Sequence, residues 1–332
     1  MVYFAASHRA SVRCKRPRQG YILLLGLYVL LMGLGAAFTS QAQDTWYPYP
    51  HDAEAFNYTD DQLQTLWPQL HVGDLEPFPS AEYLRQWMAK SPQIRQSIPG
   101  FKGDYAGLAK QVQEAWRCYH RGDFKHAYEQ GSKLGLVGAY VAERARAVNN
   151  SYLAPKEQRA VVLAAEWAEL SNRLDDNSLP YPNLYYNEAY VAGRYSQAIS
   201  IPTALAKGMA GKVKRAVTKV LEMQPQHPEA LTVLAAWNAE IVGQVGSVLA
   251  RMTYGASSDA AREKYQQAIG LAPDYIPLRT EYAAGLLKLD RNANRNLAME
   301  QLHKAMELKP QDAISELEQD KARQMLDEIT KN

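Results

Sequence analysis

The sequence predicts an all-α fold in which antiparallel pairs of helices stack in series. From Tyr105 onward, apolar residues recur at helical spacing in stretches that turn signals separate, and no convincing period-two pattern of a strand follows. One phrase is also repeated: Tyr265-Gln-Gln-Ala268-Ile-Gly-Leu-Ala-Pro273 returns 37 residues later as Leu302-His-Lys-Ala305-Met-Glu-Leu-Lys-Pro310. A repeated phrase of helical character indicates a repeated helix, so the fold is expected to be an array.

Length and composition are those of a folded globular protein. The 332 residues suffice for one large domain or two ordinary ones, and 47% of them are hydrophobic and 22% charged. The net charge of +2 hides an asymmetry, because residues 1–42 carry five basic residues and no acidic one. The rest of the chain is slightly acidic and lacks the positive field that non-specific nucleic-acid binding requires, so nucleic acid is not expected as a partner.

Residues 1–42 have the pattern of a signal peptide. A basic stretch precedes the uncharged apolar run from Tyr21 to Ala37, and small residues follow up to Ala42. We expect cleavage after Ala42 and a mature protein that is periplasmic or otherwise exported. The alternative is an uncleaved inner-membrane anchor, with the body outside the cytoplasm and the membrane contacted only through this segment.

Residues 43–104 are rich in proline and aromatic residues, which predicts irregular chain broken by short helices. One helix is expected to begin after Ser80, a good N-cap, and to continue through Met88. We interpret this lead-in (residues 43–104) as a structural cap on one end of the array, because the end of a repeat array needs covering. The alternative is an arm that binds a partner.

Residues 105–332 are predicted to form the helical array itself. Its last helix is expected to close the end opposite the lead-in. The predicted helices are Tyr105–His120, Lys125–Gly135, Val137–Asn149, Lys156–Leu174, Leu184–Gln197, Lys212–Met223, Pro228–Gln244, Ser258–Leu271, Ile276–Leu289, Asn296–Leu308 and Ala313–Ile329.

The repeated phrase carries the residue types that close helix packing requires. Ala261 and Ala298 stand four residues before Tyr265 and Leu302, so small and large side chains share one helix face. Small residues let a neighbouring helix approach, the large residue fills the groove, and the proline ends the hairpin. The residues assigned to repeat packing are Gly122, Ala127, Ala261, Tyr265, Ala268, Pro273, Ala298, Leu302, Ala305 and Pro310.

The repeated phrase resembles the second helix of a tetratricopeptide repeat (TPR), although its period exceeds the usual value of about 34 residues. The segment from Gly122 to Tyr128 resembles the turn between the two helices of such a repeat. Residues 234–241 and 254–257 are similar to bacterial relatives of the regulator-of-microtubule-dynamics family, and the periplasmic T component of some tripartite transporters has a similar divergent architecture. The resemblance covers about Tyr105 to Leu308 and implies a TPR-like superhelical stack with a concave binding side.

No motif with a known catalytic or metal-binding mechanism is found. HExxH and Gly-x-Ser-x-Gly are absent, no serine has a lysine three residues later, and no two histidines stand four residues apart. The segment Gly208-Met-Ala-Gly211-Lys212 has the wrong glycine spacing for a phosphate loop. We interpret His120 as a solvated imidazole beside a buried thiol at Cys118. The sequence therefore predicts no metal, no cofactor and no enzymatic activity.

Two helix faces combine aromatic and polar residues in a way typical of binding surfaces. Tyr186, Tyr190 and Arg194 recur at intervals of four, and Trp237, Glu240 and Gln244 share a face of another helix. Tyr, Trp and Arg carry much of the energy of recognition, because they offer large contact area together with a hydrogen-bonding tip. The alternative, which is the commoner role of an aromatic stripe at helical spacing, is that these rings fill the groove between helices.

The leading functional hypothesis is an exported, non-catalytic TPR scaffold or adaptor that binds a protein or peptide partner in its concave groove. The alternative is a periplasmic protein that binds a small ligand or assists a transporter, as the T component does. A third hypothesis, an enzyme of unrecognised type, has no converging residues in its favour. A scaffold predicts an open groove wide enough for a helix or an extended chain, whereas a carrier predicts a closed apolar cavity of roughly several hundred Å³ with few polar groups.

Overall fold

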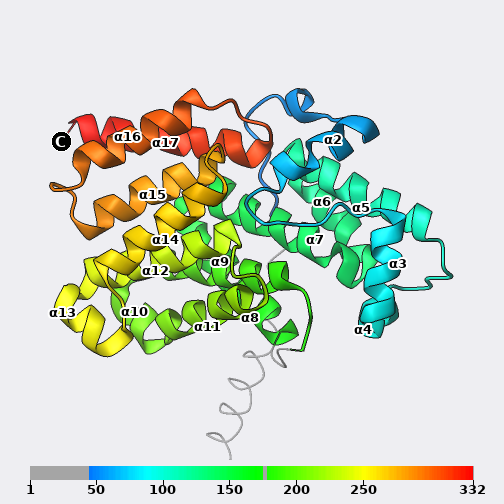
Figure 1. The fold of residues 1–332 in the computed structure, drawn as a ribbon, viewed down its shortest axis with the longest axis horizontal. Coiled ribbons are helices and arrows are strands. Elements are labelled where there is room, and N and C mark those ends of the chain that lie inside the picture. Colours follow the sequence, from blue (N-terminus) through cyan, green and yellow to red (C-terminus); the bar gives the residue numbers. More distant parts are fainter. Residues whose placement is uncertain (1–44, 175–177, 332) are drawn as a thin grey trace, which may run out of the picture. The chain divides into compact units, whose positions relative to one another are not determined.

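In the computed structural model, which describes residues 45–174 and 178–331, every regular element is a helix (Figure 1). The predicted all-α class is confirmed for these residues. None of the described helices is both long enough and apolar enough to span a membrane. The predicted signal peptide with its cleavage after Ala42, and the alternative membrane anchor, lie outside the described residues.

The helices follow one another with short joints. In chain order they are α2 (Asp60–Leu70), α3 (Ala81–Lys90), α4 (Pro92–Gln96), α5 (Tyr105–His120), α6 (Phe124–Gly131), α7 (Leu136–Val148), α8 (Lys156–Arg173), α9 (Pro182–Ala198), α10 (Ile201–Ala206), α11 (Met209–Met223), α12 (Pro228–Val245), α13 (Ser247–Leu249), α14 (Ser258–Leu271), α15 (Ile276–Leu289), α16 (Arg295–Glu307) and α17 (Ala313–Lys331). Two 3₁₀ turns, η1 (Ala53–Phe56) and η2 (Ser132–Leu134), and two π-helical turns, η3 (Asn149–Leu153) and η4 (Ala250–Tyr254), lie between them.

Most of these bounds agree with the predicted ones. The helices α5, α14 and α15 have the expected ends, and α3 begins after Ser80, whose hydroxyl accepts a hydrogen bond from the Tyr83 N–H. The sequence does not predict α2, because Pro68 reads as a helix breaker although it is accommodated near the end of that helix. It does not predict α10 either, since six residues are too few to show a helical period.

The two copies of the repeated phrase lie on helices that pack on α15. The side chains of Ala261, Tyr265 and Ala268 on α14 are buried, and so are those of Ala298, Leu302 and Ala305 on α16. The Tyr265 ring stacks on Tyr282 of α15, with 4.9 Å between ring centroids. Pro273 and Pro310 follow the ends of α14 and α16.

The turn assigned to repeat packing at Gly122 and Ala127 is also tightly built. Gly122 has a positive φ of 88°, which glycine adopts without strain, and Ala127 is fully buried. A Cβ at Gly122 would lie 2.5 Å from the ring of Tyr49 in the lead-in. The turn between α5 and α6 is therefore a contact surface for the lead-in.

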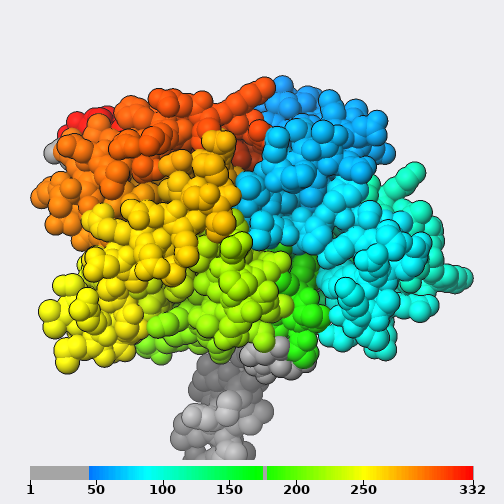
Figure 2. Space-filling view, in the orientation of Figure 1, coloured from blue at the N-terminus to red at the C-terminus, as the bar shows by residue number. Residues whose placement is uncertain are grey.

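The lead-in and the last helix are in contact, although the prediction assigned them to opposite ends of the stack. The Tyr49 hydroxyl donates to Oε2 of Glu316 on α17 at 2.5 Å, and His51 Nε2 lies 2.6 Å from Asp320 Oδ2. Figure 2 shows the blue lead-in residues against the orange C-terminal helices. These contacts join residues more than 260 positions apart, and no local sequence pattern encodes such a pairing.

Residues Trp46–Asn332 form one compact unit. Every cluster of buried apolar side chains in the described part of the chain lies within it, and the largest includes Leu63, Trp67 and Leu84 of the lead-in. The lead-in is thus a part of the core as well as a cover. A chain that begins at Gln43 retains all of these core contacts.

Gly285 on α15 tests the close packing of the repeat. A Cβ there would lie 2.5 Å from Cε2 and Oη of the buried Tyr265 ring, so we expect Gly285→Ala to lower the free energy of unfolding by about 1–3 kcal/mol. Gly270 on α14 has open space around the equivalent position, and Gly270→Ala should instead stabilise by about 0.5–1 kcal/mol. Urea unfolding of both variants gives the comparison, and an equal effect of the two would contradict this packing.

Candidate functional site

A cavity of about 200 Å³ lies among α7, α9, α10, α11, α12, α15 and α17. Side chains of both predicted binding faces line it, although the sequence places these faces on separate helices. They are Tyr186, Tyr190 and Arg194 from α9 and Trp237, Glu240 and Gln244 from α12. The structure therefore brings all six predicted residues together around one space, and their role in binding stays a prediction.

One wall of the cavity is apolar and made of small residues. It consists mainly of Ala189, Gly193, Ala204, Leu205, Met209, Ala210, Val213, Ala236 and Ile241. The Trp237 indole closes this wall, since its Nε1 donates to the carbonyl of Ala210 at 2.8 Å and so ties α12 to α11. A Cβ built on Gly193 would meet no atom within 4 Å, so the glycine leaves part of the cavity unfilled.

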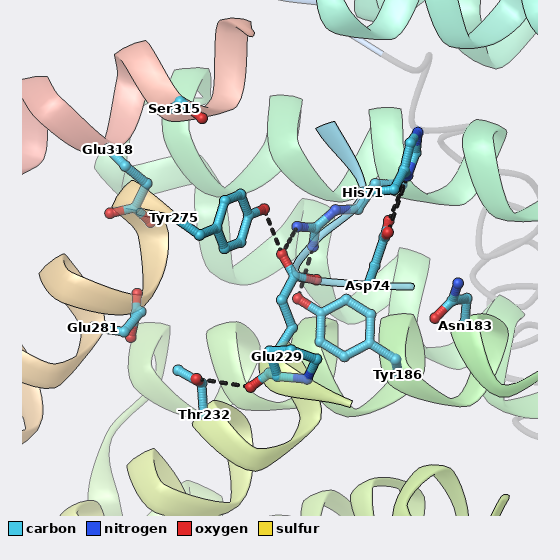
Figure 3. A network of polar contacts seen from close by, with 12 residues as sticks. His71, Asp74, Asn183, Tyr186, Glu229, Thr232, Tyr275, Glu281, Ser315 and Glu318 are labelled. Carbon is cyan, nitrogen blue, oxygen red and sulfur yellow. Dashed lines mark hydrogen bonds and ion pairs between the residues drawn. The ribbon is translucent and has the colours of Figure 1, made fainter. Parts of the chain in front are cut away.

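The rest of the lining is more polar, and one part of it rests on a buried ion pair. Arg144 of α7 donates from Nη2 to Glu229 Oε1 at 2.9 Å and from Nη1 to the Tyr186 hydroxyl at 3.0 Å. The Tyr275 hydroxyl donates to the same carboxylate oxygen at 2.7 Å, and Figure 3 shows Tyr186 and Tyr275 converging on Glu229. Burial raises the pKa of Glu229 although Arg144 opposes this. Burial would lower the pKa of Arg144, but Glu229 and the surrounding tyrosines together raise it.

A second group of charges closes the cavity toward the C-terminal helices. Arg194 Nη2 and Lys321 Nζ each donate to Oε1 of Glu281 at 2.6 Å, and the Tyr152 hydroxyl donates to Glu318. Burial alone would raise the pKa of Glu281, but the two cations hold it well below its ordinary value. These bonds join α9 to α15 and α17, so the last helices form a wall of the site.

Tyr190 lies between the two groups. The guanidinium carbons of Arg144 and Arg194 lie 5.1 and 5.0 Å from its ring centroid, within the range of cation–π attraction. Its hydroxyl is buried and finds no hydrogen-bond partner among the described residues. A buried hydroxyl without a partner costs free energy, and a polar group on a bound molecule would offset that cost.

Arg144, Glu229 and Glu281 hold the site together, and no sequence pattern predicted them. They lie on three helices, and Arg144 and Glu229 are 85 residues apart, so helical spacing cannot link them. One signal was available for Arg144: its helix, α7, is otherwise mostly Ala, Val and Gly. A helix that is apolar on all sides is buried, so a charge on it must find a buried partner.

A neighbouring polar network connects the lead-in to this site. His71 Nδ1 lies 2.9 Å from Asp74 Oδ1, and the Tyr140 hydroxyl donates to Asp74 Oδ2 at 2.8 Å. Burial alone would raise the pKa of Asp74, but His71, the Glu76 N–H and Arg144 together lower it to about 2. His120 is buried and its Nε2 lies 3.3 Å from His71 Nε2, so the interpretation of His120 as a solvated imidazole is wrong. In the part of the chain described, no group of three or more His, Cys, Asp and Glu side chains is arranged to hold a metal ion.

Glu76 ends this network inside the core. It accepts hydrogen bonds from the Tyr181 hydroxyl at 2.9 Å and from Asn183 Nδ2 at 2.6 Å. Burial, with a further contribution from Asp74, raises its pKa from 4.5 to about 7. The folded protein therefore binds a proton at Glu76 more tightly than the unfolded chain does.

This difference predicts a pH dependence of stability. The stabilising contribution of protonated Glu76 is complete below pH 4.5 and is lost as the pH rises through 7, with a slope of up to about 1.4 kcal/mol per unit. We expect Glu76→Gln to flatten the decline of the unfolding free energy between about pH 5 and 8. Glu166, whose pKa burial raises to about 8, contributes a similar decline that this substitution leaves in place. Equal slopes for the variant and the parent would contradict the assignment.

A scan against protein-family models finds none that matches the chain, and a search among curated proteins finds none that matches either. Function is therefore argued from the residues of the cavity. A function for the cavity has to account for three features: its polar wall, its apolar wall and the unpartnered hydroxyl of Tyr190.

Proposed function

We propose that this protein is a non-catalytic binding protein that holds a small amphipathic molecule in the cavity between α9, α11 and α12. One observation carries the proposal. Two independently predicted faces converge on one cavity, and the buried Tyr190 hydroxyl there lacks a partner among the described residues. Ligand sites are commonly apolar clefts with a few converging polar groups, and this cavity has that composition.

The two walls favour a particular chemistry in the ligand. An apolar body would lie against Leu205, Met209 and Trp237, where water is poorly hydrogen-bonded. A polar head would reach Tyr190, which can donate and accept. Because Arg144 and Arg194 each already bind a carboxylate, the head is better suited to hydroxyl or amide groups than to a second anion.

The size of the cavity supports a small ligand over a protein segment. Its volume of about 200 Å³ is smaller than the range of about 300–1,000 Å³ that is usual for ligand pockets, so it has room for a small molecule and not for a protein segment. Helices surround it on several sides. A concavity between α5 and α6 is lined mostly by charged and amide side chains such as Lys110, Gln113 and Arg117. We therefore rank the small-ligand or transporter-accessory function above the scaffold function, which remains the second candidate because Tyr, Trp and Arg also serve as protein anchors.

The proposal includes the architecture and the location of the protein. We interpret the fold as a divergent TPR-like array that curls until its two ends meet. The burial of Ala261, Tyr265 and Ala268 and of their counterparts on α16 supports this interpretation. The basic and apolar pattern of residues 1–42 supports export, with a membrane contact through that segment if it is not cleaved.

Filling the cavity tests the proposal without disturbing the fold. We expect Gly193→Leu to abolish ligand binding by occupying the cavity, and to keep or slightly raise the thermal stability, because leucine favours the helix and its Cβ would meet no atom within 4 Å. Gly270→Leu makes the same change at an exposed helical site and should keep the ligand. Small molecules released from each purified protein by denaturation are identified by mass spectrometry. A molecule recovered equally from both variants would place binding outside the cavity.

Tyr190→Phe tests the polar end of the site. It removes the unpartnered hydroxyl and keeps the ring between Arg144 and Arg194, so stability should be unchanged or higher by up to about 1 kcal/mol. The Kd of the molecule identified above should rise by about tenfold, as expected for one lost hydrogen bond. Tyr195→Phe, on the same helix but outside the cavity, is the control. Calorimetric titration measures the Kd of each variant, and equal Kd values for Tyr190→Phe and Tyr195→Phe would contradict the role of the Tyr190 hydroxyl.

A further inference from the structure

Exposed apolar side chains of the described residues are concentrated on short segments beside the cavity. Eight large apolar side chains are exposed among all the described residues, and five of these eight lie on α10, α13 and η4. Met252 and Val248 are the most exposed of all, at 81% and 74%, and Figure 2 shows this segment in yellow at the surface. The five are Ile201, Leu205, Val248, Leu249 and Met252.

These segments border the mouth of the cavity. Among its lining residues, Gln197, Leu205, Gly208, Gly211 and Gln244 are exposed, so the cavity opens between α10 and the end of α12. Tyr254 of η4 lines the same cavity, and its carbonyl accepts a hydrogen bond from Lys214 Nζ of α11 at 3.1 Å. The apolar side chains of α10 and of α13–η4 therefore flank one opening, and we call them the mouth patch.

The mouth patch is accompanied by basic residues. Between Ser200 and Leu221 the chain carries five of them and no acidic residue, and Arg251 adds a sixth on η4. Lys207, Arg215 and Arg251 are exposed, and Arg215 Nη2 lies 3.6 Å from Glu188 Oε1. The basic residues are Lys207, Lys212, Lys214, Arg215, Lys219 and Arg251. This concentration stands out because the chain after residue 42 is slightly acidic as a whole.

We infer that the mouth patch docks on the surface of an anionic phospholipid bilayer. Apolar side chains on short helices insert into the boundary between headgroups and acyl chains, and neighbouring cations bind anionic headgroups. The patch offers both, with Val248 and Met252 exposed on α13 and η4, exposed Arg251 on η4 and exposed Lys207 directly after α10. Docking would turn the opening of the cavity toward the bilayer. The inference rests on surface side chains, so it holds or fails independently of what the cavity binds.

A second copy of the chain is a poorer occupant. A twofold interface through the mouth patch would bring the same cations of two copies against each other, because symmetric dimers pair each patch with itself. Like charges across an interface are unfavourable, whereas an anionic surface neutralises them. The charge of the patch thus favours the bilayer.

Vesicle flotation tests the inference with the chain Gln43–Asn332, which lacks the apolar run from Tyr21 to Ala37. We expect binding to phosphatidylcholine vesicles that contain about 30% phosphatidylglycerol, little binding to pure phosphatidylcholine, and weaker binding as salt screens the charges. Val248→Asp with Met252→Asp should weaken binding by about tenfold or more. Lys207→Gln with Arg251→Gln should weaken it by about fivefold for each cation removed.

Matched variants control for changes in charge and hydropathy elsewhere. Leu271 is exposed at the far end of α14, about 20 Å from the start of that helix beside η4. Leu271→Asp should therefore leave vesicle binding unchanged. Lys102→Gln with Lys309→Gln removes two exposed cations at other sites and should have little effect. Circular dichroism verifies that every variant is folded.

Two kinds of result would overturn the inference. The first kind is a failure of the vesicle test: the protein binds neither kind of vesicle, or the mouth-patch variants and their controls change vesicle binding equally. The other is a dimer, seen by analytical ultracentrifugation, that dissociates in Val248→Asp with Met252→Asp, which would assign the patch to a second copy. If the mouth-patch variants lose vesicle binding that the parent chain shows, and still retain the cavity ligand, the result would support docking and leave the proposed function intact.

Discussion

Arg144 lies in the middle of α7 with its guanidinium buried, and a buried charge is tolerated only when it is paired and hydrogen-bonded. Its partners come from α9 and α12, through Tyr186 and Glu229, and Tyr275 before α15 binds the same carboxylate. One side chain therefore specifies how three helices and the start of a fourth meet. Leaving either charge unpaired would cost about 3–5 kcal/mol, so alternative arrangements of these helices are strongly disfavoured.

The lead-in is held by the same arrangement. The Glu229 N–H donates to the carbonyl of Gly73 at 3.0 Å, and a Cβ at Gly73 would overlap the Tyr275 ring. Segments that are 156 and 202 residues distant from Gly73 thus meet at one glycine of the lead-in. This explains why the first described residues belong to the core, and why the C-terminal helices can lie against them.

The candidate site follows from this framework. The Arg144–Glu229 ion pair joins α7 to α12, and Arg144 also binds the Tyr186 hydroxyl of α9. Arg194 of α9 pairs with Glu281 of α15, and the small residues of α10 and α11 leave space beside these helices. Both guanidinium groups are paired with a carboxylate within the protein, whereas the Tyr190 hydroxyl and Glu229 Oε2 have no hydrogen-bond partner among the described residues. A site of this kind is preorganised, because its polar groups need not be rearranged or desolvated when a ligand enters.

The sequence by itself determined the helices and the faces they present, because helix formation depends on bonds four residues apart and on a period that can be read locally. For this reason the bounds of α14 and α15 and the two faces containing Tyr190 and Trp237 could be predicted. Tertiary structure alone decided that these faces share a cavity, that Arg144 pairs with Glu229, and that the lead-in meets α17. The Arg144–Glu229 and Tyr49–Glu316 contacts join residues 85 and 267 positions apart. They depend on the sum of all the crossing angles between helices, which no local pattern encodes.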